Sequence, residues 1–211
     1  MRYFLLIVGF VTSFFGIGFF GITAAQAAIV MGNTTGTVTL VEFYDYQCPA
    51  CKAMVPVVNM LIKNDSYLRV VYSNFPFLGE NSVYAAKAVI ASVEQNKFPA
   101  FHEALMAYPG TLTPNNILAV AQKAGLNVQQ LTKAINSPAV TDELAKQLQL
   151  GSALGVRVTP TFIIGATRAN VNPRQFQGKV DYETLQNAIV LVHSQSSTLR
   201  PDVQVPTSAK P

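Results

Sequence analysis

The chain contains no tryptophan, two histidines and only two cysteines among its 211 residues. Two cysteines are too few for the set of disulfide bridges that holds a small secreted domain together. They could supply half of a zinc site, but the only histidines, His102 and His193, lie far apart in the sequence. We therefore expect neither a metal nor another cofactor.

Charged residues are also scarce, at 12% of the chain, and the net charge is only +4. The basic residues are dispersed along the sequence rather than clustered. A nucleic-acid-binding protein usually carries a dense basic patch, so we expect no nucleic-acid partner.

The only apolar run of membrane-spanning length covers residues 4–22 and follows Arg2. Ala25-Gln26-Ala27 comes shortly after it and has the small-x-small pattern of a signal-peptidase site. We predict a signal peptide over residues 1–27, cleaved after Ala27 or, as the next choice, after Ala28. An uncleaved membrane anchor is the alternative, because about 20 apolar residues span a bilayer. Both alternatives export the rest of the chain.

The two cysteines form the tetrapeptide Cys48-Pro49-Ala50-Cys51, directly after an apolar and aromatic run. Thiols in an oxidising compartment pair if their geometry allows. A bridge that closes a four-residue loop stabilises a fold by about 2 kcal/mol, against about 3 kcal/mol for a 15-residue loop. The pair is therefore better explained by reactivity than by stabilisation of the fold.

Residues 37–80 show the pattern of a strand, a helix and a second strand. The strands are expected at 37–44 and 68–75, which are rich in β-branched and aromatic residues. The helix is expected at 50–64, where Pro56 should introduce a kink. This order predicts a right-handed βαβ unit.

A helical insertion is expected over residues 81–154. Its helix-start signals are Thr113-Pro114, Asn127 and Ser137-Pro138, since Ser, Thr and Asn cap helices and proline suits the first helical position. The expected helices are 82–95, 98–108, 114–124, 127–136 and 138–154.

Residues 155–193 return to strands and a final helix. One strand is predicted at 161–164, with weaker ones around 168–171 and 175–180, and Asp181 caps the helix. The predicted fold class is α/β, in the order βαβ, helical insertion, ββα.

The two flanking segments are expected to lack regular structure. Residues 28–36 form a short polar lead-in. Residues 194–211 contain three prolines and almost no apolar pattern, which predicts a disordered tail.

Cys48 falls at the predicted start of a helix, where free N–H groups and the helix dipole favour negative charge. Cys51 follows one turn later, so it can reach Cys48 without a backbone rearrangement. Pro49 suits the first helical position. We predict that Cys48 is the exposed attacking thiol and Cys51 the resolving thiol.

Glu42 interrupts an otherwise apolar strand, six residues before Cys48. A carboxylate on a buried strand is costly unless it is paired or functional. At this spacing it could lie beneath Cys51 and accept its proton during exchange. The alternative is a residue near the strand end that faces water.

Val158-Thr159-Pro160-Thr161 places a proline at the start of a predicted strand, which suits a cis peptide bond. Such a bond would expose backbone groups of Thr159 beside the cysteine pair. These groups could pair with an extended substrate chain as an added strand.

Three separated features together make the chain resemble the DsbA-like branch of the thioredoxin superfamily. They are Glu42 followed by Cys48-Pro-Ala-Cys51 with Pro56, the helical insertion, and the Gly155-Val-Arg-Val-Thr-Pro-Thr-Phe segment. The resemblance covers about residues 37–192. It implies a thioredoxin-like fold and a thiol–disulfide oxidoreductase of the bacterial periplasm or cell envelope.

The resemblance also implies a role for each site residue. Cys48 and Cys51 are expected to form a redox-active disulfide, with Cys48 as nucleophile. Glu42 is the buried carboxylate that assists proton transfer, and Thr159 and Pro160 are the cis-proline pair that faces the disulfide. The implied partners are exported proteins with reduced cysteines and a DsbB-like, quinone-linked membrane oxidant.

Ala50 is the main departure from the best-studied DsbA proteins, which carry histidine there. Less stabilisation of the thiolate should make the disulfide less oxidising, with a potential between about −120 mV for DsbA and about −270 mV for thioredoxin. Thr159 is a residue common in disulfide isomerases as well as in several DsbA-like groups. An isomerase or reductase on the same scaffold is therefore the alternative to an oxidase.

Isomerases of this family usually dimerise through an N-terminal extension, whereas here only residues 28–36 precede the first expected strand. We therefore expect a monomer. A function of another class is also open, namely a non-catalytic metal-binding or chaperone module. Some of four phenylalanines could then line a peptide groove, although a core position is the expected one for them. They are Phe75, Phe77, Phe98 and Phe101.

Overall fold

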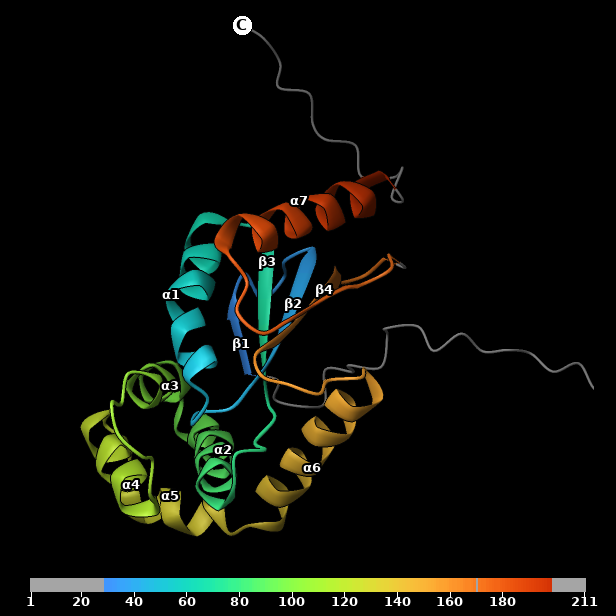
Figure 1. Ribbon diagram of the computed structural model, residues 1–211. Helices are drawn as coiled ribbons and strands as arrows, with labels where there is room; N and C mark the ends of the chain where they lie inside the picture. The colour runs from blue at the N-terminus through green and yellow to red at the C-terminus, as the bar shows by residue number, and fades with distance from the viewer. Residues whose placement is uncertain (1–28, 170, 199–211) are drawn as a thin grey trace, which may run out of the picture.

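The structure is a computed structural model that describes residues 29–169 and 171–198 (Figure 1). The predicted signal peptide over 1–27 lies outside these residues, and so does most of the predicted tail. Within the described ranges, no helix combines the length and the apolar character needed to span a membrane.

A five-stranded mixed sheet forms the centre of the fold. Its strands are β1 (Ile29–Gly32), β2 (Val38–Tyr44), β3 (Leu68–Asn74), β4 (Thr161–Ala166) and β5 (Arg174–Gln177). Their spatial order is β1-β3-β2-β4-β5. The central strand β2 pairs in parallel with β3 and antiparallel with β4, while β1 and β5 add antiparallel edges.

The helices divide between the sheet and the insertion. They are α1 (Pro49–Asn64), α2 (Glu80–Ser92), the short 3₁₀ helix η2 (Val93–Gln95), α3 (Phe98–Met106), α4 (Pro114–Lys123), α5 (Val128–Ile135), α6 (Pro138–Ala153) and α7 (Tyr182–Thr198). Figure 1 shows α1 and α7 beside the sheet, with α2 to α5 gathered at one end of it. The predicted α/β class and its βαβ, helical, ββα order are confirmed.

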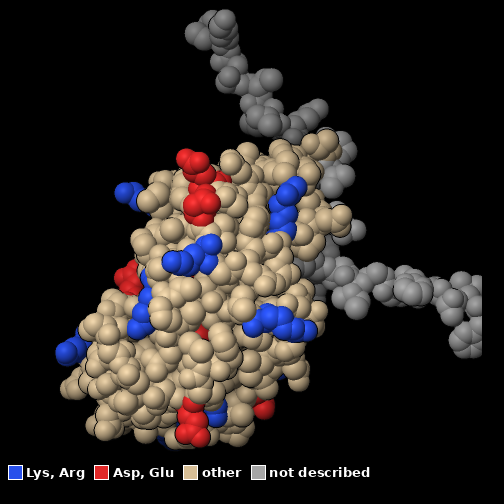
Figure 2. Space-filling model, viewed as in Figure 1, with Lys and Arg blue, Asp and Glu red and all other residues tan. Residues whose placement is uncertain are grey.

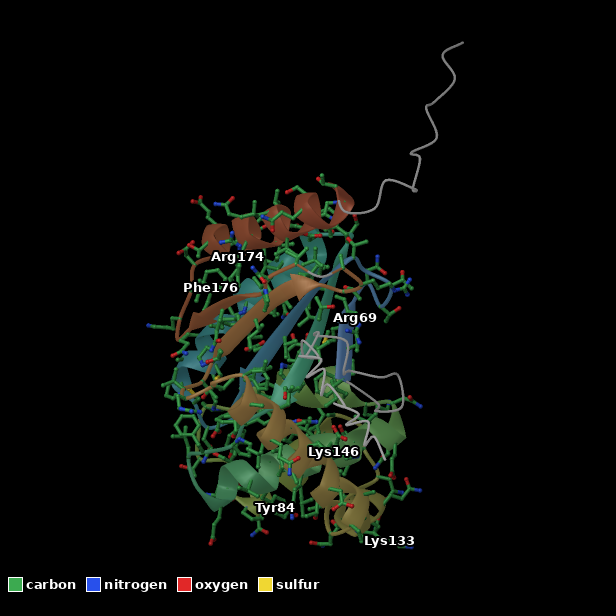
Figure 3. All side chains as sticks on the ribbon, turned by 90° about the vertical axis from the view of Figure 1, so that its right-hand side faces the viewer. Arg69, Tyr84, Lys133, Lys146, Arg174 and Phe176 are labelled. Atoms are coloured by element: carbon green, nitrogen blue, oxygen red, sulfur yellow. The ribbon has the colours of Figure 1, made fainter. Side chains whose placement is uncertain are left out.

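Figure 3 makes the same two-part division visible from the side. Arg69, Arg174 and Phe176 lie on the sheet half, whereas Tyr84 and Lys133 lie on the helical half. On the face that Figure 2 shows, Lys and Arg side chains are separated by uncharged surface rather than joined in one patch.

The helix-start residues predicted inside the insertion act as N-caps in the structure. The side chains of Thr113, Asn127 and Ser137 accept hydrogen bonds from backbone N–H groups in the first turns of α4, α5 and α6. Asp181 does the same at α7, where its carboxylate accepts a 2.8 Å bond from the Thr184 N–H. Pro56 lies inside a continuous α1.

The two faces of the sheet are packed differently. One face carries Leu40 and Tyr44 of β2 into the large core with α1 and α7. The other carries Phe43 into a smaller cluster against the C-terminal end of α6. There Gly151 allows a close approach, because a Cβ at this position would lie 2.7 Å from the Phe75 ring.

The predicted irregular lead-in over 28–36 is wrong in part. Residues 29–32 form β1, which pairs with β3 through Ile29 opposite Tyr72. The segment is only four residues long, and its hydrogen-bonding partner lies about forty residues away in the sequence, so local pattern did not indicate a strand.

Two further predictions are corrected. The weak strand predicted around 168–171 does not form in the described residues of that range, which lie in the connection between β4 and β5. At the start of this connection, the N–H of Thr167 donates a hydrogen bond to the carbonyl of Thr37. The tail predicted from residue 194 begins as helix, since α7 continues to Thr198 and Ser196 is buried.

Candidate redox site

The two cysteines lie at the start of α1, as the sequence predicts. Cys48 is the N-cap residue, with extended backbone (φ −76°, ψ 117°), and Pro49 occupies the first turn, where it leaves no N–H unsatisfied. Cys51, one turn later, is fully buried, whereas Cys48 retains 7% exposure. Both are free thiols in this structure. Cys48 is therefore buried as well, and the prediction of an exposed thiol at this position is wrong; Cys48 is only the less buried cysteine of the pair.

The loop before β4 lies against Cys48. The Cys48 thiol donates a 3.3 Å hydrogen bond to the carbonyl oxygen of Thr159, across 111 positions of sequence. The Thr159–Pro160 peptide bond is cis, as predicted. The structure therefore brings together Cys48, Thr159 and Pro160, with Pro49 exposed and Ala50 half-buried beside them.

Glu42 lies in the middle of β2 and is 4% exposed, so the alternative of a carboxylate that faces water is wrong. It stands opposite Tyr72 on β3 and Phe162 on β4. Because side chains alternate along a strand, it shares the face of Tyr44, which packs in the same core as Cys51. Burial raises the pKa of the Glu42 carboxyl to about 8.

Cys51 is the other strongly perturbed group of the site. Burial raises the pKa of its thiol well above the usual range, and negative charge at Cys48 and Glu42 raises it further. The backbone of Asp45 and the Thr159 hydroxyl partly offset this by favouring the thiolate. That hydroxyl completes no hydrogen bond among the described residues, so its effect is that of a nearby dipole. The buried sulfur therefore strongly prefers to be a neutral thiol.

Three residues that the sequence did not single out hold the turn before Cys48. The Asp45 carboxylate accepts from the N–H groups of Gln47, Phe77 and Leu78 at 2.8–3.1 Å. The Gln47 side chain accepts a 3.0 Å bond from the N–H of Leu112.

Tyr46 completes this set through a buried histidine. The Tyr46 hydroxyl lies 2.8 Å from Nδ1 of His102 on α3 and 3.2 Å from the Tyr44 hydroxyl. Burial lowers the pKa of His102 to about 3. His102 is thus a neutral core residue that supports the redox turn, whereas His193 stacks on Tyr67 at the other end of α1.

A sequence signal for Asp45 was present. An acidic residue between a buried strand and a helix start commonly bonds the backbone N–H two residues on, as Asp45 does with Gln47. The partners Phe77 and Leu78 lie 32 and 33 positions away, and no local pattern indicates them.

Exposed apolar side chains lie on the segments that contact the redox turn. Phe77 and Leu78 are 50% and 45% exposed, and Val158, next to Thr159, is 41% exposed. The expectation of a core position for the phenylalanines is therefore wrong for Phe77 and confirmed for Phe98 and Phe101, which are buried. Phe75 is partly buried against Phe43.

The arrangement defines a site for thiol–disulfide exchange. It combines a cysteine at a helix start that is 7% exposed, a fully buried second cysteine one turn away, and a buried carboxyl on the adjacent strand. Among the described residues, no group of three or more His, Cys, Asp and Glu side chains is placed to hold a metal ion.

Comparisons with known proteins agree with this class. Residues 39–190 match the family described as DSBA-like thioredoxin domain. The chain belongs to this family of DsbA-like thiol:disulfide oxidoreductases.

Two solved structures and one curated protein illustrate the similarity. A thioredoxin-like oxidoreductase from Silicibacter pomeroyi DSS-3 is 36% identical, with a TM-score of 0.73 over 79% of this chain and 92% of that one. The thiol–disulfide exchange protein alpha-DsbA2 from Wolbachia pipientis is 27% identical, with a TM-score of 0.70 over 79% and 88%. The Na(+)/H(+) antiporter NhaA 3 of Salinispora tropica is 27% identical over 82% of this chain, which spans only 26% of that protein's length.

Proposed function

We propose that this protein is an exported thiol–disulfide oxidase that introduces disulfide bonds into other exported proteins. The observation that carries the proposal is the placement of Cys48 and the more deeply buried Cys51 at one helix start, with the Cys48 thiol bonded to the Thr159 carbonyl. An asymmetric pair of this kind gives each sulfur a separate role in exchange.

The oxidised protein begins with a disulfide between Cys48 and Cys51. A substrate thiolate attacks the Cys48 sulfur, the disulfide breaks, and Cys51 leaves as a thiolate. A second substrate thiolate then attacks the substrate sulfur of the mixed disulfide and releases Cys48. The substrate thus loses two electrons and two protons, and both cysteines of the protein are reduced.

Glu42 transfers a proton to and from the Cys51 sulfur. The leaving sulfur enters a buried environment in which a thiolate is strongly disfavoured, so it needs a proton at once. With a pKa of about 8, Glu42 is present in both protonation states near neutral pH. Its acid form can protonate the departing Cys51, and its carboxylate can take the proton back when the disulfide is restored.

Substrate chains are expected to lie across the cis-proline loop. The backbone of Thr159 can pair with an extended chain, and Val158, Phe77 and Leu78 offer it apolar contacts. Unfolded exported proteins expose such chains together with reduced cysteines, which fits them as the substrates.

The reduced protein requires an external oxidant to act again. We propose a DsbB-like, quinone-linked membrane protein in that role, and a periplasmic or cell-envelope location supported by the predicted signal peptide. We also propose that Ala50 leaves the potential between about −120 and −270 mV, and a measured value below −270 mV would exclude a role as an oxidase.

A paired assay tests the proposal. The purified protein, first oxidised with excess oxidised glutathione, is given a reduced dithiol peptide, and separately the reduced protein is given scrambled ribonuclease without an added oxidant. Fast peptide oxidation without rescue of the scrambled enzyme is the expected result. Rescue without an oxidant would identify an isomerase instead, and inactivity of the folded protein in both assays would contradict thiol–disulfide exchange altogether. Cys48→Ser serves as the inactive control.

A further inference from the structure

The three consecutive residues before Cys48 each bond a different segment of the chain. Asp45 binds the N–H groups of residues 77–78, between β3 and α2, Tyr46 bonds His102 on α3, and Gln47 bonds Leu112 before α4. The position of the redox turn is therefore set largely by contacts outside the turn itself.

Asp45 is the strongest of these anchors. Its side chain is 1% exposed, and its two oxygens accept three backbone hydrogen bonds, one from Gln47 and two from the 77–78 segment. No Lys or Arg in the part of the chain that the structure describes forms an ion pair with it. Charged acceptors make stronger hydrogen bonds than neutral ones, so the buried carboxylate holds the two segments together firmly.

The segment that Asp45 holds carries two exposed apolar side chains. Phe77 and Leu78 are about half exposed, while their N–H groups point to Asp45. Oδ1 of the same carboxylate binds the N–H of Gln47, the residue directly before Cys48. One buried side chain therefore links the residue directly before Cys48 to the segment that carries this apolar pair.

We propose that Asp45 is a positioning residue for thiol–disulfide exchange, which holds the Phe77–Leu78 pair in register with Cys48 so that a substrate chain contacts both. The inference rests on the proposed function, since it concerns the same site. It assigns the substrate preference to extended chains with an apolar residue near the reacting cysteine. Small dithiols, which reach Cys48 alone, do not depend on the register.

The test variant is Asp45→Asn. Asparagine keeps the side-chain volume and one acceptor oxygen. Its NH₂ group must then face the N–H donors either of Gln47 or of residues 77–78, so the hydrogen bonds to one of these two segments are lost. Asp45→Ala, which removes both links, should show a larger effect in the same direction.

Asp65 offers a matched control at the other end of α1. It is also buried (4% exposed), and its carboxylate likewise accepts from the N–H two residues on, that of Tyr67, and from a second partner, Gln186. Asp65→Asn therefore removes a similar buried carboxylate without touching the redox turn.

The measurements are kcat and KM for oxidation of a dithiol peptide with a flanking leucine, with oxidised glutathione as the terminal oxidant, and the rate of reduction by dithiothreitol. All are made well below the melting temperature of each variant. For Asp45→Asn we expect a KM for the peptide about tenfold higher, which corresponds to about 1.4 kcal/mol, with kcat and the dithiothreitol rate within twofold. Asp65→Asn should match the wild-type protein in all three.

Two results would overturn the inference while leaving the proposed function intact. One is a folded Asp45→Asn protein that oxidises the peptide with an unchanged KM. The other is an equal fall in the peptide and dithiothreitol rates, which would place the effect of Asp45 on the Cys48 sulfur rather than on the apolar pair. A wild-type protein that oxidises neither substrate would instead overturn the proposed function, and the inference with it.

Discussion

Replacement of Glu42 by glutamine removes a buried ionisable group while it preserves the shape of the side chain. The pKa of Glu42 is raised from 4.5 to about 8 by burial, because the charged form is disfavoured inside the core. At about 1.4 kcal/mol per pH unit, this difference corresponds to an upper limit of about 5 kcal/mol in the free energy of unfolding. Water penetration and local relaxation lower such penalties, so we expect a measured effect on the order of 3 kcal/mol.

The sign follows from proton binding. Between pH 4.5 and 8 the folded protein keeps the Glu42 proton and the unfolded chain releases it. The contribution of this group is therefore fully present below pH 4.5, is lost as the pH rises through about 8, and is constant above that. Glu42→Gln lacks this loss, so its stability relative to the wild-type protein should rise with pH across the same window.

The assay is equilibrium unfolding in guanidinium chloride at half-unit steps from pH 4.5 to 9, with both cysteines kept reduced. Glu94→Gln, which alters an exposed carboxyl on η2, is the control and should track the wild-type protein at every pH. A difference between Glu42→Gln and wild type that does not change with pH would refute the buried, proton-binding role of Glu42.

Two further predictions concern the core. His102 has a pKa lowered to about 3 by burial, so its contribution to stability is present above pH 6.5 and is lost as the pH falls toward 3; acid unfolding should show this loss, and His102→Asn should reduce it. Gly151→Ala places a Cβ 2.7 Å from the Phe75 ring and should cost about 1–3 kcal/mol, whereas an Ala at the exposed helical position Ser152 should change the unfolding midpoint little.

Most of the features that the sequence predicted correctly are determined by neighbouring residues; the Thr159–Pro160 loop beside Cys48 is the exception, and it was predicted from the family resemblance. The caps at Thr113, Asn127 and Ser137 bond N–H groups three positions away, so their signals lie within one helical turn. The placement of Cys48 and Cys51 at a helix start is equally local, because Pro49 and the preceding strand mark it.

The features that the sequence analysis did not predict depend on contacts between residues far apart in the sequence. Ile29 belongs to an edge strand only because β3 lies beside it. Asp45 and Tyr46 acquire their roles from residues 77–78 and from His102, which lie 32 or more positions away in the sequence. Local patterns indicate elements and caps, whereas these contacts depend on how the elements meet.

The central claim is that Cys48 is the sulfur that exchanges with substrate and Cys51 the sulfur that leaves. The most direct test uses two variants with one cysteine each, Cys51→Ser and Cys48→Ser. Each variant is mixed separately with a peptide activated as a mixed disulfide, and adduct formation is followed by mass spectrometry. We predict rapid attachment of the peptide to Cys48 in the first variant and little attachment to the fully buried Cys51 in the second. Equal rates in the two variants, or faster attachment at Cys51, would contradict it.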